Sequence, residues 1–164
     1  MKFSVIIPTY NQGPLLQKAL ESVENQSYKN FETIIINNYS DDNTLEVIKN
    51  SNIQNIKVIN FSNGGVIAAS RNIGVQESSG EYICFLDSDD EWLPKKLEEI
   101  DIVTRSQTHQ IISHSENWLY PNGTIKKKTY GPSTSFKPKA LIFKKNCLST
   151  SAVTISKTLF TSLG

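Results

Sequence analysis

Short runs of β-branched and aromatic residues alternate with amphipathic segments over the first 105 residues, and this alternation constrains the fold more than any other feature. The apolar runs fall at residues 3–7, 31–36, 56–59 and 82–86. Each run is followed by a stretch whose apolar residues recur at helical spacing. Four successive β-α units predict an α/β protein with a mostly parallel sheet, flanked by helices and joined by right-handed crossovers.

Proline and capping residues mark where the helices are expected to begin. Pro14 and Pro94 stand where the first and the last of the four helices open. Ser40, which two aspartates follow, is expected to cap the second helix. The third helix is predicted for residues 66–76, where small residues indicate tight packing.

After about residue 106 the pattern changes, and antiparallel additions are expected. Asn122 and Gly123 tolerate the positive φ of a tight turn, so they predict a hairpin between the segments on either side. The expected elements of this half are strands at 110–120, 124–130 and 152–155, a short helix after Pro138 and a helix at 157–163.

The length of 164 residues corresponds to one domain, with residues 1–105 as its first half and 106–164 as its second. We interpret the second half as incomplete and the domain as truncated, because the chain stops where a helix C-cap would sit. No window approaches the roughly 18 to 20 apolar residues of a membrane span, and the first apolar run is too short for a secretory signal. These features predict a cytoplasmic protein whose cysteines, Cys84 and Cys147, are reduced.

The charged residues are divided unevenly along the chain. Residues 1–116 hold all 16 Asp and Glu with 9 Lys and Arg, a net −7, whereas residues 117–164 hold 8 Lys and no acid, a net +8. Chemistry that needs a carboxylate must therefore use the first 116 residues or a group outside this chain. The lysine run 126–128 is expected to be a solvated strand end, with an anionic partner as the alternative, and we expect no nucleic-acid partner.

Polar residues follow three of the four strands, at the edge where open α/β sheets bind ligands. The sharpest of these segments contains Asp87, Asp89 and Asp90, which would repel one another without a counter-charge. Carboxylates are suitable ligands for Mg²⁺ or Mn²⁺, and one or two of them leave positions for phosphate oxygens. The alternative is acidic decoration of a helix N-terminus, although a cap would use one acid and not three.

Other candidate residues have two interpretations each. Arg71 can bind a phosphate or a base edge in a forked geometry, or form an ion pair. His109 and His114 are expected to be structural, because no nucleophile is spaced to match either. Trp92 is expected to pack at a helix start, and Trp118 either packs or stacks on a sugar ring. Dinucleotide-binding and P-loop motifs are missing from the sequence.

Together these motifs resemble the family 2 glycosyltransferases, which have the GT-A fold. The matching segments are SVIIPTYN at 4–11, N-x-G with A-x-R-N-x-G between 63 and 74, and GEYI with FLDSDD and Trp92 between 80 and 92. The resemblance is dense to about residue 94 and looser to residue 164. It implies a Rossmann-like sheet and metal-dependent transfer of a hexosyl or N-acetylhexosaminyl group, with inversion, from a nucleotide-diphosphate donor to a hydroxyl.

The resemblance also implies roles for individual residues. The nucleotide would be bound by Pro8, Thr9, Tyr10, Asn38, Ser40, Arg71, Asp87 and Ser88. Mn²⁺ or Mg²⁺ would be bound by Asp89 and Asp87, with Asp89 as the direct ligand. The implied partners are a UDP-sugar and a saccharide or lipid-linked saccharide acceptor, in bacterial cell-surface polysaccharide synthesis at the inner face of the membrane.

Two departures from the family pattern affect these expectations. Many members have Asp-Asp-Gly-Ser after the second strand, where this chain has Asn-Asn-Tyr-Ser at residues 37–40, so Asn38 stands in place of the base-recognising Asp. Members also place a carboxylate base late in the domain, and this chain has none after Glu116. The base is therefore expected beyond Gly164, or this form does not turn over. The alternative function is a non-catalytic nucleotide-binding module.

Overall fold

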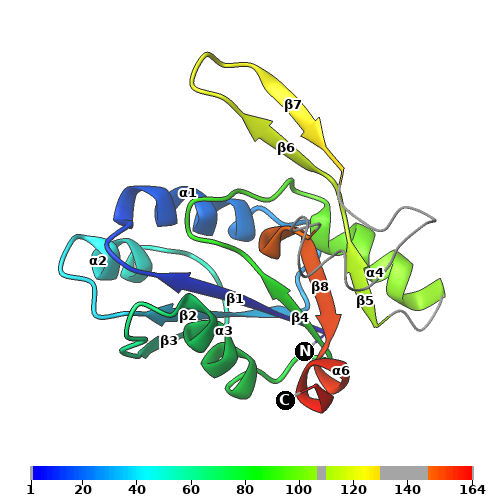
Figure 1. Cartoon of the computed structure of the whole chain (residues 1–164), viewed down its shortest axis with the longest axis horizontal. Helices are drawn as coiled ribbons and strands as arrows, with labels where there is room; N and C mark the ends of the chain where they lie inside the picture. The colour runs from blue at the N-terminus through cyan, green and yellow to red at the C-terminus, as the bar shows by residue number, and fades with distance from the viewer. Residues whose placement is uncertain (1, 107–109, 130–147, 164) are drawn as a thin grey trace.

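The computed structural model describes residues 2–106, 110–129 and 148–163 (Figure 1). Its first part contains the four predicted β-α units in the predicted order. They are β1 (Phe3–Thr9), α1 (Gly13–Glu24), β2 (Phe31–Asn37), α2 (Thr44–Lys49), β3 (Ile56–Asn60), α3 (Ile67–Gln76), β4 (Tyr82–Phe85) and α4 (Lys96–Ser106). Strands β1 to β4 pair in parallel, so the predicted sheet is confirmed.

The second part adds antiparallel strands. Its elements are β5 (Ile111–Ser113), β6 (Glu116–Leu119), β7 (Ile125–Lys128), η1 (Thr150–Ala152), β8 (Val153–Ser156) and α6 (Lys157–Ser162). Strand β8 runs antiparallel to β4, and β5 runs antiparallel to β8, which gives a six-stranded sheet of order β3-β2-β1-β4-β8-β5. Strands β6 and β7 form a separate hairpin, in which Gly123 has φ +78°.

The strand expected at residues 110–120 is two strands in the structure. Strand β5 belongs to the main sheet and β6 to the hairpin, with His114 and Ser115 between them. Figure 1 shows the hairpin projecting from the body of the protein. The helix expected after Pro138, together with His109 and Cys147, lies outside the described residues. Cys84 is a free, buried cysteine, as expected.

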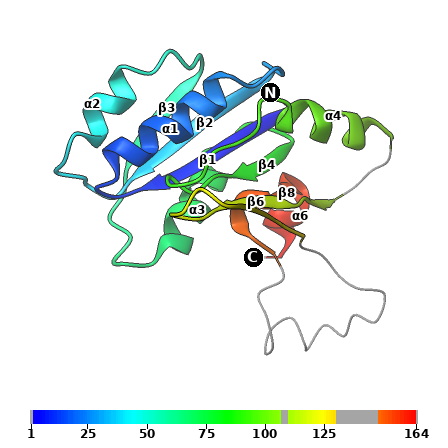
Figure 2. The same ribbon diagram turned by 90° about the horizontal axis from the view of Figure 1, so that it is seen from above.

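Helices cover both faces of the sheet. Figure 2 shows α1, α2 and α4 on one face and α3 and α6 on the other. Residues of β1 alternate between the two cores, with Phe3, Val5 and Ile7 facing the first and Ile6 the second. Helix α3 approaches β1 closely because residue 74 is glycine, where a Cβ atom would lie 2.4 Å from Cγ2 of Ile6. The small residues of this helix thus allow the tight packing that the sequence indicated.

The start of α2 differs from the prediction. Ser40 does not cap this helix, because the N-cap residue is Asn43. Asp42 accepts a hydrogen bond from the Thr44 backbone N–H instead, at 3.0 Å. Ser40 lies three residues before the N-cap and bonds to the neighbouring strand and loop, which removes it from the helix end. Local capping preference was overridden by contacts between two loops.

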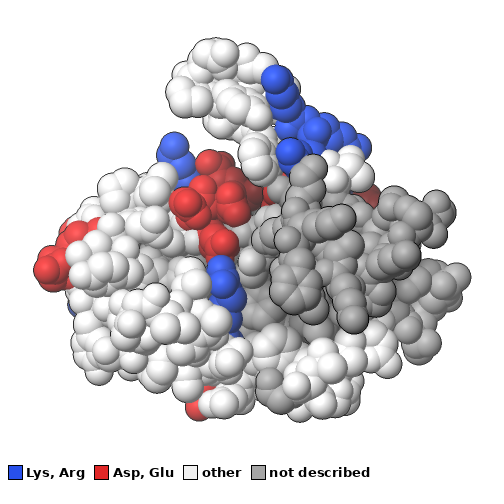
Figure 3. All heavy atoms as spheres, viewed as in Figure 1, with Lys and Arg blue, Asp and Glu red and all other residues white. Residues whose placement is uncertain are grey.

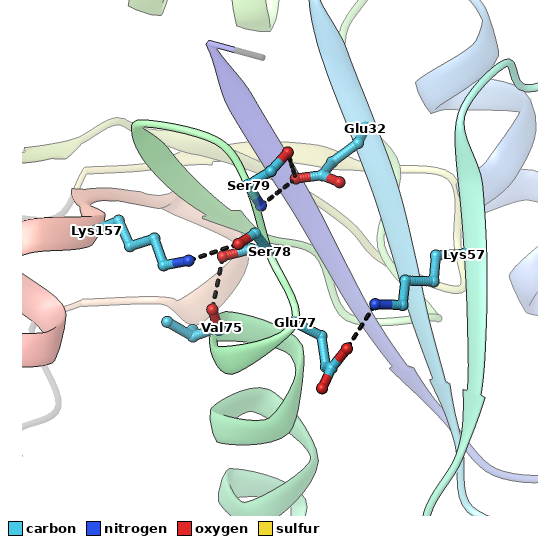
Figure 4. A network of polar contacts seen from close by, with 7 residues as sticks. All are labelled: Glu32, Lys57, Val75, Glu77, Ser78, Ser79 and Lys157. Carbon is cyan, nitrogen blue, oxygen red and sulfur yellow. Dashed lines mark hydrogen bonds and ion pairs between the residues drawn. The ribbon is translucent and has the colours of Figure 1, made fainter.

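At the amino-terminal edge of the sheet, the Glu32 carboxylate accepts several hydrogen bonds (Figure 4). Its Oε1 atom accepts from Ser4 Oγ at 2.6 Å and from the Ser79 N–H and Oγ at 2.6 and 2.8 Å. Burial alone would raise the pKa of Glu32, but these bonds and one from the Gly80 N–H outweigh it and lower the pKa. Lys157 donates to the Ser78 carbonyl nearby, so α6 is tied to the same edge.

Candidate functional site

A cavity of about 430 Å³ opens at the carboxyl ends of the parallel strands, where the sequence placed the ligand site. Its lining comes from the loops after β1, β2, β3 and β4, and from the start of α3. The lining residues are Pro8, Thr9, Tyr10, Gln12, Asn38, Asn63, Gly65, Ile67, Asp87, Ser88 and Asp89. Of the predicted site residues, Ser40 and Arg71 lie outside this set.

The segment Asp87–Asp90, which we call the acidic turn, forms one end of the cavity. Arg71 Nη2 donates to Asp87 Oδ1 at 2.5 Å, so the ion-pair interpretation of Arg71 holds and the pair lies at the cavity. The Asp90 N–H donates to the Asp87 carbonyl at 3.0 Å and closes the turn. Ser88 donates to Gln12 on the first loop. The turn is therefore attached to both α3 and the β1–α1 loop.

Ser151, in η1, holds the acidic turn from the second half of the chain. Its Oγ accepts from the Asp87 N–H at 3.0 Å, and the side chain is nearly fully buried. The pKa of Asp90 is raised, mainly because its carboxyl group is partly removed from water even though the residue is exposed overall. The charges of Asp89, Asp87 and Glu116 also raise this pKa, whereas a hydrogen bond with Ser151 lowers it. The acidic turn is thus held in a conformation in which its carboxylates repel one another. Sequence reasoning missed Ser151, because 64 residues separate it from Asp87.

Lys96 lies on the other side of Ser151. It donates from Nζ to the Ser151 carbonyl at 3.3 Å, and Nζ lies 3.3 Å from the ring centroid of Trp92. Burial lowers the pKa of Lys96 to about 7. Burial and the charge of Lys96 also lower the pKa of His114, whose buried Nε2 has no hydrogen-bond partner among the described residues. Trp92 packs in the core, as expected.

The other end of the cavity is built from neutral amide side chains on the loops after β2 and β3. Asn38 accepts at Oδ1 from the Asn63 N–H at 3.1 Å, and Asn63 Oδ1 accepts from the Gly65 N–H at 2.9 Å. Tyr10, which directly follows β1, also lines the cavity and is 55% exposed. The sequence analysis identified Asn63 and Gly65 as positions of a family motif without assigning them to the nucleotide site, and no sequence motif pointed to Gln12 or Ile67. These four residues are the part of the lining that it missed.

The loops after β1 and β2 are joined by a set of reciprocal hydrogen bonds. Asn11 Nδ2 donates to Asp41 Oδ1 at 2.6 Å, and the Asp41 N–H donates to Asn11 Oδ1 at 2.9 Å. The Asn11 N–H donates to Ser40 Oγ at 3.0 Å, and the Gly13 N–H to Asp42 at 2.9 Å. Ser40 and Asp41 therefore support the cavity wall rather than line the cavity.

Two buried polar atoms at the site have no partner among the described residues. They are Oγ1 of Thr9 and Nε of Arg71. An unpaired buried donor or acceptor costs free energy, and such atoms are most easily explained where a ligand completes the bonding.

Acidic side chains gather below the projecting hairpin in Figure 3, whereas the hairpin itself carries basic ones.

The comparisons with known proteins agree with this geometry. The profile of glycosyl transferase family 2 matches residues 4–101. The chain belongs to this family. It is 37% identical over 99 residues to the GalNAc(5)-diNAcBac-PP-undecaprenol beta-1,3-glucosyltransferase of Campylobacter jejuni, covering 58% of this chain and 32% of that protein. This chain covers 16%, 32% and 35% of the length of three curated relatives, so it spans about a third of these proteins or less.

Solved structures confirm the GT-A fold that the resemblance implied. The S. aureus TarS fragment 1–349 in complex with UDP gives a TM-score of 0.80 at 26% identity, over 99% of this chain and 49% of that chain. The mannosyltransferase PcManGT from Pyrobaculum calidifontis, in complex with GDP-Man and Mn²⁺, gives a TM-score of 0.70 at 17% identity, over 99% of this chain and 46% of that chain. The second likeness shows the fold alone.

Proposed function

We propose that this chain binds the nucleotide-diphosphate donor of a sugar-transfer reaction. The observation that carries the proposal is the cavity of a family 2 chain with two unlike ends. The loop after β4 brings Asp87 and Asp89 to one end, and the loops after β2 and β3, on the other side of β1, bring the neutral amides Asn38 and Asn63. A nucleoside diphosphate has the matching division, with a charged diphosphate at one end and an uncharged, planar base at the other.

A divalent cation fits the charged end. Asp89 lines the cavity, and among the described residues it makes no ion pair, whereas one oxygen of Asp87 is used by Arg71. Two carboxylates do not enclose a cation alone, and no cluster of three His, Cys, Asp or Glu occurs in the described parts of the chain. A donor diphosphate would supply the remaining oxygens that Mg²⁺ or Mn²⁺ requires. When bound, the metal would supply Lewis-acid stabilisation of the leaving diphosphate.

The residues of the chain itself would orient the donor. Arg71 holds Asp87 in place, and its buried Nε has no hydrogen-bond partner in the part of the chain that the structure describes. Thr9 lines the cavity, and its hydroxyl has no hydrogen-bond partner within residues 2–106, 110–129 and 148–163. Asn38, fixed by the Asn63 N–H, would present its amide to the base. Pro8 and Ser88 complete the lining of the proposed nucleotide site, and Ser40 supports that lining through its bonds to Asn11 and Asn37.

The donor we favour is a UDP-sugar, because the TarS fragment is described in complex with UDP at 26% identity. The acceptor would be a saccharide or lipid-linked saccharide, since the C. jejuni relative is named for an undecaprenol-linked one. The reaction would proceed with inversion, in cell-surface polysaccharide synthesis at the cytoplasmic face of the membrane. No helix within residues 2–106, 110–129 and 148–163 is long and apolar enough to cross a bilayer.

We further propose that the base for the acceptor hydroxyl comes from outside these 164 residues. Inverting transfer needs a base on the face opposite the diphosphate. Residues 117–164 contain no carboxylate, and the lowered pKa of His114 is explained by its half-buried place between β5 and β6. The chain alone should therefore bind donor without releasing UDP from UDP-glucose. UDP release that His114→Ala abolishes would contradict this assignment.

The test of the proposed function is calorimetric titration of the chain with UDP, once with Mn²⁺ and once with EDTA. Binding should require the metal, because the acidic turn would otherwise repel the diphosphate. GDP and CDP serve as comparison ligands. Equal affinity with and without metal would contradict the metal assignment, and no binding of any nucleoside diphosphate would contradict the proposed function.

A further inference from the structure

The residue after Asn38 is in a backbone conformation that its side chain disfavours. Tyr39 has φ +55°, in the left-handed region. Among the described residues, the other non-glycine residues with positive φ are Asn11 and Asn55. Asparagine tolerates this region because its short side chain bonds locally, whereas a bulky aromatic residue there is an outlier. Glycine would occupy the same position without strain.

Contacts on both sides of Tyr39 impose this conformation. The Asn38 N–H donates to the Thr9 carbonyl at 3.0 Å. Ser40 donates to Asn37 Oδ1 from both its N–H, at 3.1 Å, and its Oγ, at 2.6 Å. Backbone strain persists when surrounding contacts over-determine it, and it concentrates at ligand sites. The loop thus holds the tyrosine in place, although the tyrosine is poorly suited to the loop.

The side chain of Tyr39 contributes little to the stability of the fold. It is 62% exposed, and within the described residues it makes no hydrogen bond and no ring contact. Yet Tyr39 directly follows Asn38, which lines the neutral end of the cavity. Tyr10 lies on the neighbouring loop and lines the same cavity as Asn38. Two exposed tyrosines therefore belong to the loops after β1 and β2, which both contribute lining residues, although Tyr39 itself is outside the lining set.

We propose that Tyr39 is a nucleotide-binding residue whose ring packs against the base of the donor. The inference rests on the proposed function, because it requires a nucleoside at the neutral end. Every base presents a flat π-face, so an aromatic ring adds affinity for any nucleotide without selecting the base. Recognition of the base would remain with Asn38. Strain in the β2–α2 loop is then explained by binding rather than by folding.

The test compares Tyr39→Gly with Tyr39→Asn and Tyr39→Phe. The first two replace the ring by residues that tolerate positive φ, and Tyr39→Phe keeps the ring and the strain. For each variant, thermal unfolding and the affinities for UDP and inorganic pyrophosphate are measured with Mn²⁺. Pyrophosphate is the control ligand, because it uses the charged end and has no base.

Tyr39→Gly and Tyr39→Asn should unfold at the wild-type temperature or above it, and bind UDP on the order of tenfold more weakly. Their pyrophosphate affinity should stay within about twofold of wild type, and Tyr39→Phe should bind UDP as wild type does. Unchanged UDP affinity in Tyr39→Gly, or an equal loss for pyrophosphate, would overturn this inference alone. If wild type binds none of UDP, GDP and CDP, the proposed function falls together with it.

Discussion

The two edges of the parallel sheet place carboxylates in opposite environments. At the amino edge, Glu32 accepts hydrogen bonds from Ser4, Ser79 and Gly80, and its pKa is lowered. At the carboxyl edge, the pKa of Asp90 is raised by partial burial and by like charges. One edge satisfies its charge internally, whereas the other leaves charge unsatisfied, which is typical of a binding site.

The same contrast extends beyond the carboxylates. The carboxyl edge holds Tyr39 in a strained conformation, Thr9 and Arg71 with unpaired buried atoms, and Lys96 as a buried amine. None of these features stabilises the free chain. Substitutions at the amino edge should therefore lower stability and spare binding, whereas substitutions at the carboxyl edge should weaken binding or raise stability.

The largest expected effect is at Asp89. Asp89→Ala should weaken Mn²⁺-dependent UDP binding on the order of a hundredfold, because loss of a direct ligand exceeds the effect of losing an outer-shell partner. Asp41→Ala is the matched control, since Asp41 bonds to Asn11 outside the cavity lining. Calorimetry with UDP measures both variants. If only Asp41→Ala lost UDP binding, the assignment of the metal site to the loop after β4 would be wrong.

At the amino edge, Glu32→Gln should lower the free energy of unfolding by about 2 kcal/mol, because charge-assisted bonds become neutral ones. A lowered pKa stabilises the fold above the ordinary value of about 4.3 and ceases to do so as the pH falls through the folded-state value. The difference between variant and wild type should therefore disappear in acid. Urea unfolding from pH 7 to pH 3 measures it, and altered UDP affinity at pH 7 would break the contrast between the edges.

How far the sequence predicts these edges depends on the range of the interactions. The strand ends, the hairpin turn and seven of the lining residues follow from local pattern and family motifs, because each signal lies within a few residues. Ser151, Gln12 and the displaced role of Ser40 depend on contacts between distant segments. Spacing along the chain does not encode such contacts. The strain at Tyr39 was equally invisible, because φ is imposed by the bonds on either side.

Lys96 tests whether the carboxyl edge lowers stability. Lys96→Met should raise the free energy of unfolding by roughly 1 kcal/mol at pH 7, since an apolar residue of similar volume replaces a buried amine. A lowered lysine pKa means that the fold is destabilised while the amine is protonated, and this effect fades as the pH rises from about 7 to 10. The gain should shrink over the same range. A gain that is constant with pH would show that packing, and not charge, is responsible.

The smallest expected effect is at Asn38, and its sign is more informative than its size. Oδ1 of Asn38 already accepts from the Asn63 N–H, and Nδ2 makes no hydrogen bond to the described residues. Asn38→Asp would keep that bond and replace the free donor by an acceptor. The N3–H of uracil is a donor, whereas N3 of cytosine is an acceptor. UDP should therefore bind more tightly to the variant by about 1 kcal/mol, roughly fivefold, and CDP more weakly.

Calorimetry with UDP and CDP on wild type and Asn38→Asp separates base recognition from charge. If the added carboxylate acted only by repelling the diphosphate, both nucleotides would lose affinity together. Opposite changes in the affinities for UDP and CDP would show that Asn38 recognises the base. Unchanged affinity for both would mean that the side chain of Asn38 does not contact the base.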